Sequence, residues 1–191
     1  MFWNERSTLL ISDVHLGKVS HFRKFGAAVP QEAIQGNFIL LDVSVDFFKP
    51  KRICFLGDLF HSHLNNEWNY FEAWVSKIKT EIILVNGNHD IISPLKYEAL
   101  GIQVIDELII ENFLMTHHPE ERKDFFNFCG HIHPAVRISG QGKQALRLPC
   151  FFKSQNQMIL PAFGEFTGSY TLKQKKNNEA YAIAEGMVIK I

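Results

Sequence analysis

Short apolar runs alternate with amphipathic stretches in the first half of the chain. The run Thr8–Ser12 is continuous and stops at Asp13, which favours a strand buried on both faces. After Pro30, a residue suited to the first turn of a helix, apolar positions recur every three or four residues until Pro50. The same criteria predict strands over Arg52–Leu56 and Glu81–Val85 and a helix over Glu67–Ile78. This βαβαβ order predicts an α/β fold, with helices packed on a largely parallel sheet.

The second half of the chain has a different pattern. From Ile102 onward, short apolar segments are separated by turn residues, which indicates a series of strands. The expected strands are Glu107–Glu111, Phe113–Thr116, Phe125–Cys129, Val136–Ser139, Gln144–Phe152, Gln157–Leu160, Ser169–Leu172, Ala180–Ala184 and Met187–Ile191. We therefore expect a second sheet. The length fits one compact domain, spanning residues 1–191.

Charge and composition narrow the class of protein. Lys plus Arg and Asp plus Glu both number 20, so there is no strong long-range attraction for nucleic acid or membranes, and any preference for a polyanion is local. The apolar runs are far shorter than the roughly 20 residues that span a bilayer, so we expect no membrane partner. The first residues lack the order of a secretory signal, and Cys54, Cys129 and Cys150 lack CxxC spacing. We expect a cytoplasmic location and reduced thiols.

Residue types that bind metals follow one predicted strand after another. The segments are LLISDVH, CFLGDLFH, ILVNGNHD, FLMTHHP and FNFCGHIH. In α/β sheets functional groups gather where strands end, so five such ends can converge on one crevice. Eight of the nine histidines lie in or beside these segments, and only His21 lies apart. Histidines spread by chance would also occur in the C-terminal third.

Each segment alone is open to a simpler interpretation. Asp13-Val14-His15 also fits an aspartate that caps a loop beside a structural histidine, and Gly57-Asp58 is a common turn dipeptide. Gly130–His133 also fits a surface strand. Gly87–Asp90 is more informative, because it places an amide, an imidazole and a carboxylate on one tight turn. Together and in this order they predict a metal site. Its candidate ligands are Asp13, His15, Asp58, Asn88, His117, His131 and His133.

This order of segments resembles the calcineurin-like metallophosphoesterase family, whose D-x-H, G-D, G-N-H-D/E, H and G-H-x-H motifs are matched between Asp13 and His133. The resemblance implies a sandwich of two mixed β-sheets flanked by helices, with two metal ions. It implies one ion held by Asp13, His15 and His133, another held by Asn88, His117 and His131, and Asp58 shared by both. It also implies catalytic roles for His89, which would contact the phosphate and assist the leaving group, and for Asp90, which would orient the His89 ring.

The chemistry of phosphoester cleavage accounts for these residue types. Two cations about 3.5–4 Å apart neutralise the phosphate oxygens and lower the pKa of a bridging water, so that hydroxide attacks. Carboxylate, amide and imidazole ligands suit manganese, iron, nickel or zinc better than magnesium, and we expect manganese or iron first. An imidazolium at His89, paired with Asp90, can protonate the leaving group near neutral pH.

Two pairs of histidines leave alternatives open. Either His117 or His118 can reach the metal; we favour His117, which comes first after the apolar run, as the family ligand usually does. His118 is then a rim residue or a partner of a ligand. His61 and His63 are interpreted as polar loop residues near the mouth of the pocket, although either can touch substrate.

Longer segments have a narrower resemblance. DVHLGKVSHFRKFGAAVP, RLPCFF and LPAFGEFTGS resemble the bacterial ligase-associated metallophosphoesterases, a subfamily linked to DNA repair genes. The resemblance implies DNA as a partner and a functional link to DNA ligase and helicase proteins. The first segment also contains a basic cluster in the expected loop after the first ligands, which either grips a phosphate beside the scissile one or forms an ordinary solvated face. Its members are Lys18, His21, Arg23 and Lys24.

Three functions therefore compete. The first is a phosphodiesterase or nuclease that acts on DNA, and the second is a hydrolase of a small phosphoester, cyclic nucleotide or lipid pyrophosphate. The third is a non-catalytic interaction module, as the related retromer subunit is. The intact set of ligands argues against the third.

Overall fold

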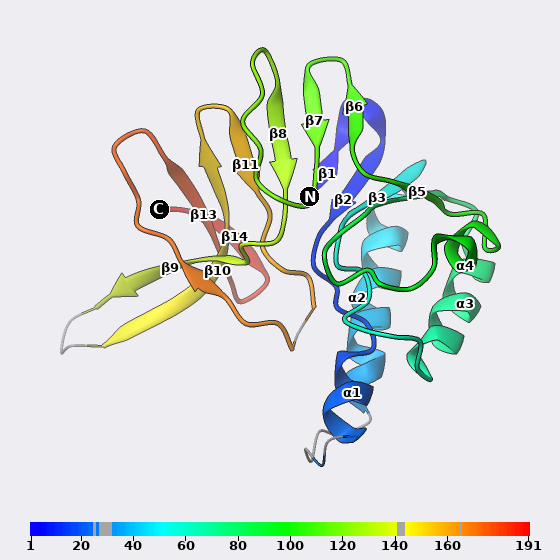
Figure 1. The fold of residues 1–191 in the computed structure, drawn as a ribbon. Coiled ribbons are helices and arrows are strands. Elements are labelled where there is room, and N and C mark those ends of the chain that lie inside the picture. Colours follow the sequence, from blue (N-terminus) through cyan, green and yellow to red (C-terminus); the bar gives the residue numbers. More distant parts are fainter. Residues whose placement is uncertain (25, 27–31, 141–143, 165) are drawn as a thin grey trace.

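The computed structural model describes residues 1–24, 26, 32–140, 144–164 and 166–191 of the 191-residue chain. Two β-sheets face each other, and helices cover the outer side of one of them (Figure 1). The sandwich of two mixed sheets is thus confirmed.

The first sheet contains the strands of the βαβαβ pattern. Its order is β1-β2-β3-β4-β5, with bounds β1 Phe2–Trp3, β2 Thr8–Ile11, β3 Arg52–Leu56, β4 Glu81–Val85 and β5 Gln103–Ile105. β2 to β5 run parallel, and β1 is antiparallel to β2. The three predicted strands are confirmed to within one residue. β1 and β5 were not predicted, because two or three residues are too few to establish a period.

Helices pack on one face of this sheet. They are α2 Glu32–Phe48, α3 Glu67–Lys77 and α4 Pro94–Glu98, while α1 Lys18–Lys24 lies beyond the end of β2. The two predicted helices are confirmed, although Pro30, the expected start of the first, lies outside the described residues. Within the described part of the chain, no helix is long and apolar enough to cross a membrane.

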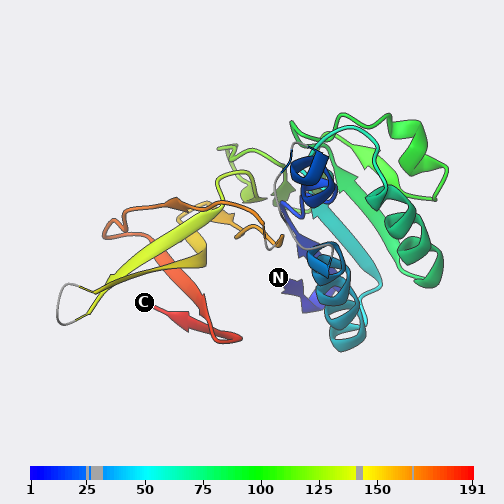
Figure 2. The ribbon, with the colours of Figure 1, turned by 90° about the horizontal axis from the view of Figure 1, so that it is seen from below.

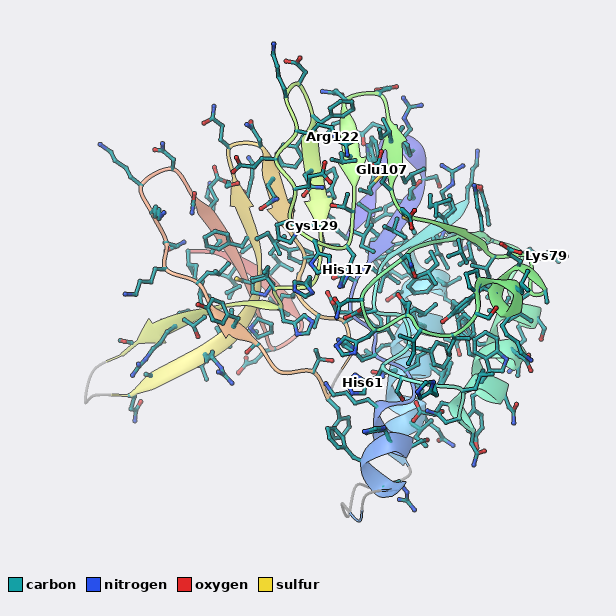
Figure 3. The ribbon with its side chains drawn as sticks, viewed as in Figure 1. His61, Lys79, Glu107, His117, Arg122 and Cys129 are labelled. Atoms are coloured by element: carbon teal, nitrogen blue, oxygen red, sulfur yellow. The ribbon has the colours of Figure 1, made fainter. Side chains whose placement is uncertain are left out.

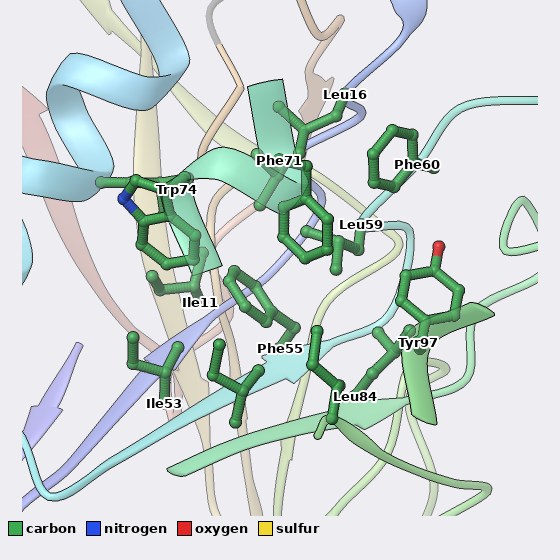
Figure 4. Packing of buried hydrophobic residues seen from close by; sticks show 14 of the residues in the cluster. Ile11, Leu16, Ile53, Phe55, Leu59, Phe60, Phe71, Trp74, Leu84 and Tyr97 are labelled. Atoms are coloured by element: carbon green, nitrogen blue, oxygen red, sulfur yellow. The ribbon is translucent and has the colours of Figure 1, made fainter. Parts of the chain in front are cut away.

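The alternation of side chains along each strand divides the core into two layers. In β3, Ile53 and Phe55 point toward α3, where they pack with Phe71 and Trp74 (Figure 4). Cys54 and Leu56 point the other way, into the layer between the sheets. Both faces of the strand are buried, which explains its continuous apolar run.

The second sheet is formed by the short strands of the C-terminal half. They are β6 Leu108–Ile110, β7 Phe113–Met115, β8 Phe126–Cys129, β9 Pro134–Ser139, β10 Ala145–Ser154, β11 Gln157–Ile159, β12 Tyr170–Thr171, β13 Glu179–Ala184 and β14 Met187–Lys190. The order is β12-β9-β10-β11-β8-β7-β6, with β13 pairing β10 and β14. All nine predicted strands overlap these.

Candidate metal centre

Five loops meet where the two sheets approach each other. The strands β2, β3 and β4 are parallel, as are β7 and β8, so each group ends at one edge. Backbone hydrogen bonds join the loops: Asp13 N donates to Gly57 O at 3.2 Å, and Gly130 N donates to His117 O at 3.0 Å. In Figure 3, His117 lies between the sheets and His61 lies on the side of α1. The fold therefore brings the five strand ends together, as the sequence predicted.

The first group of metal-binding side chains is Asp13, His15 and His133. One potential ligand atom from each lies within 4.8 Å of the others. His133 Nε2 is 3.0 Å from Asp13 Oδ1. Both ring nitrogens of His15 are buried without a hydrogen-bond partner, an unfavourable state for a polar group. A cation placed among these atoms would satisfy one of the two unpaired nitrogens of His15, so this group fits a metal ion.

The second group surrounds the ring of His117. Its Nε2 lies 3.0 Å from Asn88 Oδ1 and 3.2 Å from His131 Nδ1. The His117 ring is buried, Asn88 is exposed, and His131 is half-buried. An amide oxygen and two imidazole nitrogens form a donor set that suits a transition-metal ion.

Asp58 lies between the two groups. Its Oδ2 is 3.7 Å from His15 Nε2, and its Oδ1 is 3.4 Å from His117 Nε2. Each carboxylate oxygen therefore faces a different group, which is the arrangement that a bridging ligand requires.

Backbone carbonyls orient two of the rings. His117 Nδ1 lies 2.9 Å from Leu56 O, and His133 Nδ1 lies 3.1 Å from Gly168 O. A carbonyl oxygen only accepts, so in each ring Nδ1 carries a proton, and Nε2 is the nitrogen that a metal ion at the centre could bind. Sequence reasoning missed Leu56 and Gly168, because a carbonyl acceptor has no signature in the side chains.

The electrostatics of the site favour the forms that bind metals. Burial lowers the pKa of His15 to about 3, and burial followed by the charges of His118 and His117 lowers the pKa of His131. Burial alone raises the pKa of Asp13, but its contact with His133 and the charges of nearby histidines outweigh this, so the net pKa lies below its usual value. Neutral imidazoles and an ionised carboxylate are the states required of ligands.

Five of the seven candidate ligands have left-handed backbone conformations. A non-glycine residue in this region costs on the order of 1–3 kcal/mol, and such residues cluster at functional sites. Their φ angles are 56° at Asp13, 52° at His15, 52° at Asp58, 66° at His131 and 50° at His133. The backbone strain at these five positions indicates that the fold bears an energetic cost to keep the side chains pointing in these directions.

His118 lies beside the second group but contacts fewer of its members. One of its ring nitrogens falls within 4.8 Å of ligand atoms of His117 and His131. The side chain is exposed, and within the described residues it is His117, not His118, that forms the hydrogen bond with Asn88 and the close approach to Asp58. The geometry therefore favours His117, as we expected.

The expected pairing of His89 with Asp90 is wrong in this structure. The Asp90 carboxylate accepts backbone hydrogen bonds from Asp58 N at 2.7 Å, Gly87 N at 3.0 Å and Phe60 N at 3.1 Å. Burial is the main cause that raises its pKa to about 6. Within the described residues the His89 ring has no hydrogen bond; it stacks instead on the ring of His61, which is half-buried, whereas His63 is exposed. Asp90 thus holds the loop of Asp58 rather than the ring of His89.

The basic cluster lies on helix α1 and not in a loop, which corrects the sequence prediction. The buried carboxylate of Glu67 accepts hydrogen bonds from Gly17 N at 2.6 Å and Ser20 N at 2.9 Å, which fixes the first turn of the helix. Glu67 carries no motif, so sequence reasoning missed it.

The members of the cluster differ in their surroundings. Lys18 is half-buried, and its pKa is lowered by burial, with the charge of Asp58 opposing the shift. The His21 ring lies 5.7 Å from the His61 ring, centroid to centroid. Arg23 is exposed, and the side chain of Lys24 lies outside the described residues. Lys18 and His21 are therefore both placed to act beside the metal-binding groups.

Comparisons with known proteins agree with the geometry of the site. A family model described as calcineurin-like phosphoesterase matches residues 7–151. Among solved structures, the nuclease MPE of Pseudomonas putida is 29% identical, with a TM-score of 0.83 over 100% of this chain and 90% of that chain.

Other comparisons are weaker. A protein of unknown function, AQ665 from Aquifex aeolicus, is 20% identical, with a TM-score of 0.47 over 71% of this chain and 82% of that one. The E. coli phosphoesterase YfcE is 14% identical, with a TM-score of 0.49 over 96% and 97%. No curated protein matches the chain.

Proposed function

Because the chain belongs to the calcineurin-like phosphoesterase family and is a metal-dependent phosphoester hydrolase, we propose that it is a nuclease that cleaves phosphodiester bonds of DNA. The observation that carries the step from phosphoesterase to nuclease is the likeness to the nuclease MPE, which extends over the whole chain. The resemblance to ligase-associated enzymes supports a role in DNA repair beside a ligase and a helicase.

We assign the two groups of side chains to two metal ions. Asp13, His15 and His133 would hold one ion, Asn88, His117 and His131 the other, and Asp58 both. Bound there, the ions would neutralise the phosphate oxygens and supply an activated water. The mixed oxygen and nitrogen donors, without a thiolate, support manganese or iron.

The remaining residues of the site would bind the substrate and move a proton. His89 is half-buried next to Asn88, so it is placed to give a proton to the leaving alkoxide. Lys18 and His21 on α1 would hold a phosphate beside the scissile one, since a half-buried ammonium is less screened by water and attracts an anion more strongly than an exposed one.

A screen of substrates against metals tests this proposal. Metal-free protein would be supplied with manganese, iron, nickel, zinc or magnesium and assayed on bis-p-nitrophenyl phosphate, p-nitrophenyl phosphate, cyclic nucleotides and a single-stranded oligonucleotide. We expect cleavage of bis-p-nitrophenyl phosphate and of the oligonucleotide, with the highest rate in manganese or iron, and loss of activity and of bound metal in Asp58→Asn. Preference for a cyclic nucleotide or monoester over DNA would replace the nuclease with a hydrolase of small phosphoesters. Absence of all hydrolysis in metal-loaded protein would leave an interaction module.

A further inference from the structure

A pair of like charges faces each other on the β9–β10 hairpin. The antiparallel register places Arg147 of β10 directly opposite Arg137 of β9. Opposite residues point to the same face with Cβ atoms about 4.5–5.5 Å apart, and like charges in such a pair destabilise the hairpin. Both arginines are exposed. The fold thus tolerates a local repulsion that a single substitution would remove.

No acidic group of the described chain compensates this pair. The neighbours on the same face are Ser139 with Ala145 on one side and Ala135 with Pro149 on the other. Neither arginine makes an ion pair or a hydrogen bond within the described residues, whereas the surface residue Arg122 pairs with two carboxylates. Two adjacent guanidinium groups without a counter-charge are suited to an anion that comes from outside the described chain.

The face of the β9–β10 hairpin that carries Arg137 and Arg147 is connected to the metal centre. β9 begins at the residue after His133, and Arg137 lies four residues beyond it, a path of about 13 Å at the rise of an extended strand. Pro149, two residues from Arg147 and on the same face, lines a cavity of about 260 Å³ together with His133 and Thr167. Figures 1 and 2 both show the hairpin extending from the second sheet away from the helices. An extended ligand bound at the metal centre has a route to the two arginines.

We propose that Arg137 and Arg147 form a second anion site, which binds a backbone phosphate of a nucleic-acid strand whose scissile phosphate is at the metal centre. This inference rests on the proposed nuclease function. It also gives a reason why the enzyme would prefer a nucleic-acid strand to a small phosphoester. A small phosphoester has its phosphate at the metal centre and nothing to offer a site about 13 Å away, whereas a strand of several nucleotides spans both. Two guanidinium groups can share the oxygens of one phosphate by paired hydrogen bonds.

The test compares the double variant Arg137→Gln/Arg147→Gln with the wild type and with Lys175→Ala/Lys176→Ala. The control removes the same charge from exposed residues of the loop between β12 and β13. Binding of a fluorescent oligothymidylate of roughly 20 nucleotides, longer than most single-strand sites, is measured by anisotropy in EDTA, so that no cleavage occurs. The salt concentration is varied between about 50 and 200 mM. Cleavage of the oligonucleotide and of bis-p-nitrophenyl phosphate is measured with manganese.

The arginine variant should bind the oligonucleotide roughly tenfold more weakly, because two charged contacts are lost. The slope of log affinity against log salt should fall by about 0.7, the value for one phosphate contact on a single strand. KM for the oligonucleotide should rise, while hydrolysis of bis-p-nitrophenyl phosphate and all values of the lysine control stay at the wild-type level.

Three results would overturn the anion site while leaving the nuclease proposal intact. They are unchanged binding and salt slope in the arginine variant, an equal loss in the lysine control, and an equal loss of activity on both substrates. A wild-type protein that cleaves bis-p-nitrophenyl phosphate but binds no oligonucleotide would overturn the anion site as well. The partner of the two arginines would then have to be sought among acidic proteins or anionic lipid surfaces. A wild type that hydrolyses no diester would instead refute the proposed function.

Discussion

The imidazole rings of His61 and His89 stack on each other, with centroids 5.0 Å apart and planes inclined by 23°. His61 is itself fixed, because its backbone N donates to Leu16 O at 2.8 Å. The His61 ring also lies 5.3 Å from the ring of His15. Since no hydrogen bond holds the His89 ring within the described residues, this stack and an edge contact with the His15 ring, with centroids 5.5 Å apart, orient it. We infer that His61 is a positioning residue for His89.

Replacing His61 should therefore affect the proton-transfer step more than substrate binding. His61→Ala should lower kcat on an oligonucleotide about tenfold to a hundredfold, because a displaced proton donor reacts slowly. His61→Phe keeps a ring in the stack and should restore most of the rate. The loss should be smaller with bis-p-nitrophenyl phosphate, whose leaving group departs without a proton. Equal rates for the alanine and phenylalanine variants would exclude a positioning role.

Much of the fold could be predicted from the sequence, because the apolar patterns that indicate strands and helices lie within short segments. The strands β2, β3 and β4 are continuous apolar runs buried on both faces, and each is followed by its polar ligand. The expected ligands Asp13 and Asp58 lie together because the parallel strands β2 and β3 end at one edge of the first sheet, and His117 joins them from the end of β7 in the second sheet. Topology therefore brought together residues that are far apart in the sequence.

The contacts that support these ligands were not predictable in the same way. Asp90 follows His89 in the sequence, and adjacency suggested that the two side chains pair. In the structure the Asp90 carboxylate instead accepts one backbone N–H group from its own turn, at Gly87, and two from the loop after β3, at Asp58 and Phe60. The latter two depend on how the loops pack. Glu67 is similar, because its hydrogen bonds to Gly17 and Ser20 join segments about 50 residues apart in the chain.

Glu67 should control the affinity for substrate through helix α1. Glu67→Gln keeps the volume but has one acceptor oxygen where Glu67 has two, so one of the hydrogen bonds from Gly17 N and Ser20 N is lost and the other is weakened because its acceptor is neutral. We expect KM for an oligonucleotide to rise several-fold, since Lys18 is no longer held in place, with a smaller change in kcat. The matched control is Glu72→Gln, whose carboxylate accepts a hydrogen bond from Trp68 Nε1 within α3. A loss of kcat without a change in KM would contradict this assignment.

The three cysteines should be unreactive in the folded protein. Burial raises the pKa of Cys54 to about 12 and that of Cys150 to about 11, and it also raises the pKa of Cys129. At a pH of about 8 these thiols stay protonated, whereas a free cysteine titrates near 8.5. A disulfide reagent such as DTNB should label none of them quickly in native protein and all three in denaturant. Rapid labelling of one thiol would show that its layer of the core opens readily.

Gly57 and Gly101 have nearly equal φ angles but different surroundings. Alanine variants at these positions can therefore distinguish the effect of backbone strain from the effect of displacing a metal ligand. Gly57 has φ +80° and Gly101 has φ +78°, so alanine at either costs about 1–2 kcal/mol for the left-handed conformation. A Cβ at Gly101 would meet open space, whereas one at Gly57 would lie close to the ring of His117. Gly101→Ala should therefore lower the free energy of unfolding by that amount and leave metal binding unchanged.

Gly57→Ala should cost about 2–5 kcal/mol, the left-handed strain plus overpacking, and should weaken metal binding about tenfold to a hundredfold by turning His117 away from the centre. Urea unfolding of metal-free protein gives the first quantity, and titration with manganese followed by calorimetry gives the second. If both alanine variants bind manganese like the wild type, the position of His117 is not what limits metal binding, and His118 becomes the better candidate for that ligand.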